Sequence, residues 1–220
     1  MIAERQWRYL LQATTRTFIF MLLAIETATS ACSVALFDGD QIVDERHEFV
    51  ARGHAEKLIP MIESLVAGRQ PSSLLVDCGP GSFTGVRVGI AAAHGMAIGW
   101  AVPLHGYSSL ALIAAVGEED EVAAALEGGH GQLFVQSYRR DPFAATDTLA
   151  SLSPAEAAGR ITAPVIAGDG AEALIAARGY GTARSAALRA APDERRCRVG
   201  SATDGTLEAS HDRAMLSECT

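Results

Sequence analysis

Residues 79–87, GPGSFTGVR, have the composition of an anion-binding turn. The glycines allow a sharp turn, Ser82 or Thr84 can cap a following helix, and exposed backbone N–H groups can bind an anion. The lysine of a Walker A loop is missing, and the glycine spacing differs from the Rossmann G-x-G-x-x-G motif. The segment therefore predicts either a tight strand-to-helix turn or an anion or nucleotide contact through Gly81, Ser82 and Thr84.

Other groups that could do chemistry are scattered along the chain. Glu26 ends an apolar run beside two threonines, where phosphate-handling folds place an acid, so we include it as a candidate anion or nucleotide contact. His54 and Glu56 are two residues apart, which favours capping or a surface role. The sequence has no G-x-S-x-G, no H-E-x-x-H and no C-x-x-C. We therefore expect no catalytic residue and no metal site.

Small residues recur every fourth position in residues 84–100, at Gly85, Gly89, Ala93 and Ala97. A glycine inside a helix costs roughly 0.5–1 kcal/mol relative to alanine, so this pattern indicates close approach of another backbone. Two alternatives follow. The stripe packs on the protein's own sheet, or it forms a helix-to-helix subunit contact beside exposed Arg87 and His94.

The elements that must position these residues follow from hydrophobic periodicity. A Gly-Asp turn at 39–40 separates two strand-like runs, and apolar residues at helical spacing predict an amphipathic helix over 54–66. Three antiparallel strands followed by alternating helices and strands are typical of a ribonuclease-H-like lobe with a mixed α/β sheet. The predicted strands are 22–28, 31–38, 41–50, 73–78, 102–105, 121–126, 132–138 and 165–167, and the helices are 54–66, 84–100, 108–116, 171–178 and a short one from 154.

This order of elements predicts four segments. Residues 1–20 are an N-terminal extension, residues 21–105 a first ribonuclease-H-like lobe, and residues 106–185 a reduced second lobe. Residues 186–220 lack a periodic apolar pattern and are predicted to be a disordered or divergent tail.

Composition excludes two classes of protein. The chain has 220 residues, of which 49% are hydrophobic, and its formal net charge is −8. An acidic chain of this kind does not hold nucleic acid through its own basic surface. Since no uninterrupted apolar run reaches the roughly 18 residues that a membrane span needs, we expect no membrane association.

Several segments together resemble the TsaB (YeaZ) family of tRNA threonylcarbamoyladenosine biosynthesis proteins. They are LLAIETATSACSVAL (22–36), RGHAEKLIPMI (52–62) and GPGSFTGVRVGIAAAHGMAIGWAVPLHGYSSL (79–110), and the resemblance extends over roughly residues 21–180. It implies the actin-like ATPase superfold of two ribonuclease-H-like lobes, which the family shares with its catalytic partner TsaD.

The resemblance also implies a function. Members of this family are regarded as non-catalytic, cytoplasmic subunits that pair with TsaD. TsaE belongs to the same complex, tRNA is contacted only indirectly, and a homodimer is possible. ATP or ADP and a metal are then expected in the partner complex and not on the chain alone. The alternative is a stand-alone small kinase or a glycoprotease-like peptidase of the same superfold. The implied partner interface lies on the helices that begin at His54 and Thr84, with the candidate residues His54, Met61, Arg87, Gly89, Ile90, Ala93, His94 and Ala97.

Overall fold

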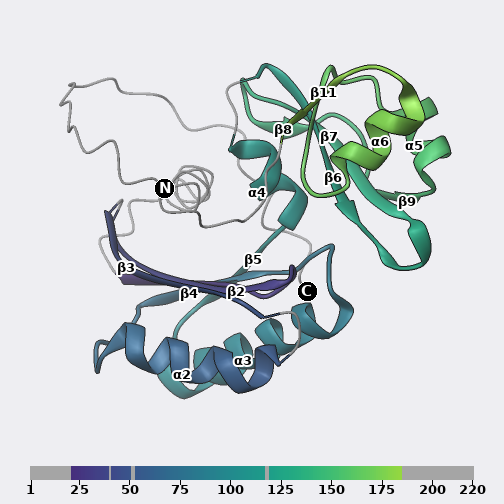
Figure 1. The fold of residues 1–220 in the computed structure, drawn as a ribbon. Coiled ribbons are helices and arrows are strands. Elements are labelled where there is room, and N and C mark those ends of the chain that lie inside the picture. The colour runs from purple at the N-terminus through teal and green to yellow at the C-terminus, as the bar shows by residue number, and fades with distance from the viewer. Residues whose placement is uncertain (1–20, 40, 51–52, 117–118, 185–220) are drawn as a thin grey trace, which may run out of the picture.

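The computed structural model describes residues 21–39, 41–50, 53–116 and 119–184. Within these ranges the chain forms two β-sheets with helices packed on them (Figure 1). The expected extension 1–20 and tail 186–220 lie outside the described residues.

The first sheet has five strands in the order β3-β2-β1-β4-β5. The first three strands are antiparallel neighbours, and β4 and β5 run parallel to β1, as the predicted meander and alternation require. The sheet extends to Tyr107, two residues beyond the boundary that we expected for the first lobe. The strands are β1 (Met21–Glu26), β2 (Ala31–Asp38), β3 (Gln41–Phe49), β4 (Ser73–Asp77) and β5 (Leu104–Tyr107).

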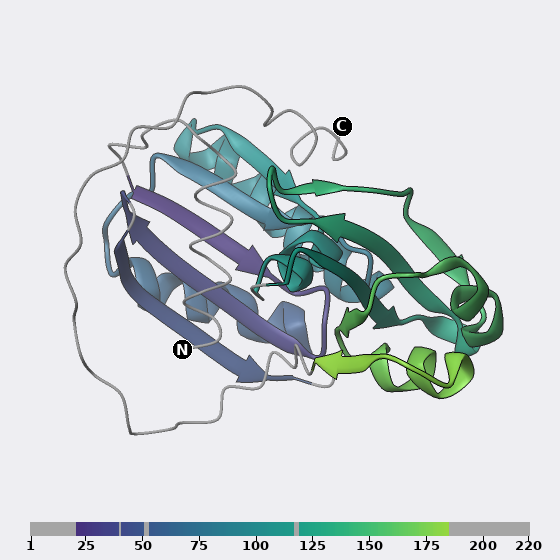
Figure 2. The same cartoon turned by 90° about the horizontal axis from the view of Figure 1, so that it is seen from above.

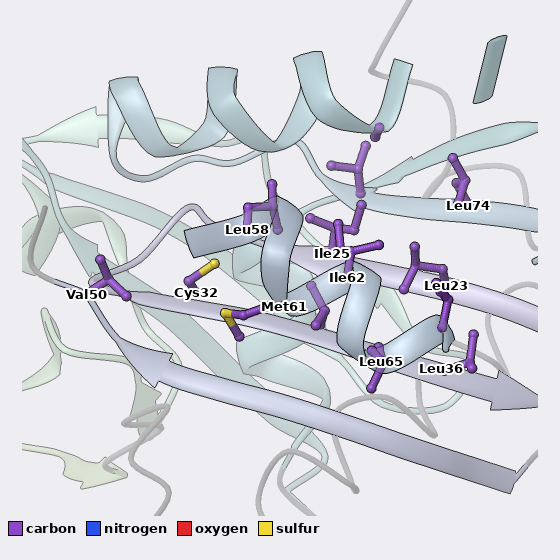
Figure 3. Packing of buried hydrophobic residues seen from close by; sticks show 14 residues of the cluster. Leu23, Ile25, Cys32, Leu36, Val50, Leu58, Met61, Ile62, Leu65 and Leu74 are labelled. Atoms are coloured by element: carbon purple, nitrogen blue, oxygen red, sulfur yellow. The ribbon is translucent and has the colours of Figure 1, made fainter. Parts of the chain in front are cut away.

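Two helices, α2 (His54–Val66) and α3 (Phe83–Trp100), cover one face of this sheet (Figure 1). Leu58, Ile62 and Leu65 of α2 pack against Leu23 and Ile25 of β1 (Figure 3). The helical spacing read from the sequence is therefore confirmed for α2, although Ile59 is exposed and Met61 is buried instead.

The short helix α4 (Ser109–Ala115) lies on the opposite face of the first sheet and is buried on all sides. Its Leu112 packs with Phe37, Leu75 and Tyr107 of the first sheet. Its Leu110 and Ile113 pack instead with residues of the second sheet. Because its side chains contribute to both cores, α4 joins the two lobes.

The second sheet has the order β11-β10-β6-β7-β8, with β9 paired to β7. Helices α5 (Pro154–Arg160) and α6 (Ala171–Arg178) pack on it around Ala125, Val135 and Ile166. In Figure 2 these green helices lie at the side away from the first sheet. The remaining elements are β6 (Glu121–Glu127), η1 (Gly129–Gly131), β7 (Leu133–Arg139), β8 (Ala144–Ala145), β9 (Ala150–Leu152), β10 (Val165–Ala167) and β11 (Thr182–Arg184).

Candidate functional site

The small-residue face of α3 packs on the chain's own first sheet. A Cβ atom added to Gly85 would overlap the carbonyl oxygen of Thr27, and one added to Gly89 would overlap the Thr27 hydroxyl oxygen. The Thr27 hydroxyl also donates a hydrogen bond to the Gly85 carbonyl, at 2.8 Å. Of the two alternatives for this stripe, close packing within the chain is therefore the one observed for Gly85, Gly89 and the buried Ala93.

Four residues that we expected at a partner interface are buried, and this corrects the prediction. Gly89 and Ala93 face the first sheet, and Met61 packs in the core between α2 and the sheet. His54 neither caps α2 nor lies on the surface, because its Nε2 atom lies 3.1 Å from the carbonyl oxygens of both Thr29 and Ala31. These four residues are packed within the fold of the chain itself.

The exposed side of α3 carries the rest of the predicted interface. Arg87 and His94 are exposed, whereas Ile90 and Ala97 are partly buried against the core. The Arg87 guanidinium lies 3.2 Å from the centroid of the Phe83 ring, which is 73% exposed, and Ile98 is 80% exposed. We call this surface the outer face of α3. It consists of Phe83, Thr84, Arg87, Ala91, His94 and Ile98.

The turn before α3 is tight, and its groups bond within the chain. The Ser82 hydroxyl accepts a hydrogen bond from the Gly85 N–H at 3.2 Å and so caps the helix. A Cβ atom on Gly81 would overlap the Ala28 carbonyl oxygen, whereas the Thr84 side chain is exposed. The segment is therefore the strand-to-helix turn of the first alternative.

Glu26 does not join Gly81, Ser82 and Thr84 in an anion site. Since side chains alternate along a strand, Glu26 shares the face of Leu22 and Ala24, which is the face opposite α3. Its carboxyl group is buried, with 1% of the residue exposed. Desolvation by burial, and then the nearby charge of Asp77, raise the pKa of Glu26 to about 8.

Asp77 was missed by the sequence analysis. Asp77 is the last residue of the buried strand β4, as Glu26 is the last residue of β1. A single acid at the end of an apolar strand was the sequence pattern that could have identified it. Its Oδ1 atom accepts hydrogen bonds from the Gly79 N–H and the Ser109 hydroxyl, both at 2.7 Å. Burial nevertheless raises the pKa of Asp77 to about 7, and the two hydrogen bonds oppose that shift.

These acids belong to a polar row that crosses the first sheet. Ser33 lies opposite both Glu26 and His47 in the strand register, and Asp77 lies opposite Tyr107. The Ser33 oxygen is 2.8 Å from His47 Nδ1 and 3.4 Å from a Glu26 carboxylate oxygen. Among the described residues, no group of three histidine, cysteine, aspartate or glutamate side chains is arranged to hold a metal ion.

The chain is similar to several known proteins whose names refer to the same tRNA modification. Residues 45–153 match the family described as TsaD, tRNA N6-adenosine threonylcarbamoyltransferase. The TsaB protein of Escherichia coli strain K12, named tRNA threonylcarbamoyladenosine biosynthesis protein, is 37% identical over 129 residues, which is 54% of this chain and 55% of the relative. The TsaB protein of Bacillus subtilis strain 168 is 29% identical over 125 residues, again 54% and 55% of the two chains.

A solved structure is similar to most of this chain. YeaZ from Pseudomonas aeruginosa superposes with a TM-score of 0.65 at 29% identity, over 76% of this chain and 84% of that one. The chain is therefore similar to proteins named TsaB or YeaZ, in sequence over about half of its length and in structure over about three quarters. Its two-sheet α/β architecture is accordingly the actin-like ATPase, ribonuclease-H-like fold that the TsaB resemblance implied.

The chain spans about half the length of the curated TsaB proteins it matches. Among the described residues, no helix is both long and apolar enough to cross a membrane.

Proposed function

We propose that this chain is a non-catalytic accessory subunit in the synthesis of threonylcarbamoyladenosine in tRNA, and that it pairs with TsaD, with TsaE acting in the same complex. Its relatives carry the name of this modification, and residues 45–153 match the TsaD family. The observation that carries the proposal is the outer face of α3, an exposed helical surface whose inner side is fixed against the sheet.

The outer face of α3 has the properties of a docking surface. Its residues are three or four positions apart and so form one continuous side of the helix. It exposes two large apolar side chains, Phe83 and Ile98, and small residues such as Ala91 allow close approach of another helix. Exposed apolar area of this kind is typical of protein–protein contacts.

The proposal assigns nucleotide and metal binding to the partner complex. Ser82 is engaged as a helix cap, and Gly81 lies in close contact with the Ala28 backbone. Glu26 lies buried on the opposite face of the sheet. Under this proposal ATP or ADP and a metal belong to the partner complex, and tRNA is contacted only indirectly. A homodimer through the same outer face competes with this pairing.

The test is binding of the full chain to its cognate TsaD by isothermal titration. We expect Ile98→Glu to weaken binding at least about tenfold, because it places a charge in an apolar contact. Leu149→Glu is the matched control, since Leu149 is also an exposed apolar residue, but of the second lobe. Equal affinities of the two variants would contradict the docking surface.

A cellular assay tests the function itself. We expect the chain to restore threonylcarbamoyladenosine in the tRNA of cells depleted of their own TsaB, and Ile98→Glu to fail while remaining folded by circular dichroism. Turnover of ATP or peptide by the isolated chain would instead support the kinase or peptidase alternative.

A further inference from the structure

Asp77 has a buried oxygen atom without a partner. Its Oδ1 accepts two hydrogen bonds, whereas Oδ2 accepts none within the described part of the chain. Only 1% of the residue is exposed, so this oxygen is shielded from bulk solvent. A buried polar atom of this kind costs free energy and indicates a missing donor.

Glu26 is placed to supply that donor. Ile25 lies opposite Val76 in the parallel pairing of β1 and β4, so the next residues, Glu26 and Asp77, are neighbours on the same face of the sheet. Glu26 Oε1 accepts from the Thr29 N–H at 3.0 Å, and its Oε2 lies 3.4 Å from the Thr29 and Ser33 hydroxyls. The Ala28 backbone N–H is a further hydrogen-bond partner of this carboxyl group. Within the described part of the chain, the hydrogen-bond donors to the two acids are therefore hydroxyl and backbone N–H groups, and none of these donors is a basic side chain.

We propose that Glu26 and Asp77 form a proton-binding site of the native protein, in which one carboxyl O–H group donates to the other carboxyl and satisfies Asp77 Oδ2. Two adjacent carboxylates in a buried site cannot both ionise without a large desolvation and repulsion cost. A single proton removes one charge and fits between two packed side chains without a cavity.

The other groups around the pair do not neutralise it. The Tyr107 hydroxyl donates to the Ile25 carbonyl at 3.3 Å, and burial raises the pKa of Tyr107 well above its usual value, so it stays neutral. Burial likewise raises the pKa of Cys32 to about 11. Ser109 of α4 and Ser33 of β2 supply hydroxyls, and His47 Nδ1 of β3 lies 2.8 Å from the Ser33 hydroxyl.

The site lies beneath the loops that hold α3. Glu26 accepts from the Thr29 N–H in the loop after β1, and Asp77 accepts from the Gly79 N–H in the loop after β4. Gly81 and Gly85 pack against the first of these loops. Loss of the shared proton therefore places two negative charges directly under the segments that fix the start of α3.

The sign of the pH dependence follows from the raised pKa values. Unfolded glutamate and aspartate titrate near 4, so the native state binds the proton more tightly than the unfolded state does. The stabilisation is complete below the unfolded pKa and is lost as the pH rises through the native values of about 7 and about 8. This pair therefore stabilises the native state less as the solution becomes alkaline.

The experiment uses the full chain and two measurements. Infrared spectroscopy at about pH 7 detects the C=O stretch of a protonated carboxyl group. We expect this band in the wild type, its loss in Glu26→Gln, and its retention in Glu121→Gln, where an exposed acid of β6 serves as the control. The urea concentration at the unfolding midpoint of the wild type should decrease as the pH is raised from about 5 to about 9. The midpoint of Glu26→Gln should change less, because the glutamine amide donates permanently to Asp77.

Asp77→Asn provides the same test if Glu26→Gln does not fold. Absence of the protonated band from the wild type, or a band unchanged in both site variants, would overturn the proposal. So would stabilisation of the wild type by Mg²⁺ that is lost in both variants, since it would assign a metal ion and not a proton to the pair.

Discussion

Gly85 and Gly89 differ in their surroundings from Gly95 and Gly99, although all four lie on α3. The first two meet Thr27 so closely that a methyl group has no room. The second two have open space where a Cβ atom would be. At the residue scale, a glycine in this helix is therefore either required by packing or simply unfavourable for helix formation.

This contrast gives a prediction for two alanine variants. Gly89→Ala should destabilise the protein by about 1–3 kcal/mol, because the added methyl group overlaps Thr27. Gly95→Ala should stabilise it by roughly 0.5–1 kcal/mol through helix propensity alone. Urea unfolding of both variants measures the difference. If the two substitutions had the same sign, the close contact at Thr27 would not exist.

The hydroxyl group of Ser82 fixes where the helix α3 begins. Ser82 caps the helix through the Gly85 N–H. We expect Ser82→Ala to lower the free energy of unfolding by about 1 kcal/mol, and Ser82→Asp to retain most of it, since aspartate is also a good cap. Thermal unfolding monitored by circular dichroism measures both. A stable alanine variant would show that the hydroxyl is not the cap.

Elements with strong periodicity were predicted closely from the sequence. The bounds of α2, β2 and α6 agree with the sequence analysis. The short strands β8, β9 and β11 were missed, because two or three residues carry no measurable alternation. The strand predicted at 102–105 lies at Leu104–Tyr107, since α3 ends in a left-handed residue at Ala101 and a linking segment with Pro103 follows.

The site was predictable only in part. Ser82 was recognised as a possible cap because capping is local in sequence. The neighbourhood of Glu26 and Asp77 was not, because it depends on β1 pairing with β4, which lies some 50 residues farther along the chain. For the same reason, the sequence could not show that His54 reaches backbone carbonyls in the loop after β1.

At the scale of the whole molecule, α4 links the two lobes. Leu112 contributes to the core of the first sheet, while Leu110 contributes to that of the second. We expect Leu112→Ala and Leu110→Ala each to cost about 2–5 kcal/mol and to lower one shared unfolding transition. Differential scanning calorimetry distinguishes the outcomes. Two separate transitions, one of them unaffected by the substitution, would show that the lobes unfold independently.

The position of β3 has a consequence for behaviour in concentrated solution. Among the described strands, β3 has β2 as its single neighbour, so its outer backbone groups form an open edge. Such an edge invites pairing with a second chain and growth into fibrils, unless charges oppose it. Asp44, Glu45, Arg46 and Glu48 supply those charges, and Lys57 of α2 forms an ion pair with Glu48 at 3.0 Å. The charged edge therefore works against edge-to-edge aggregation.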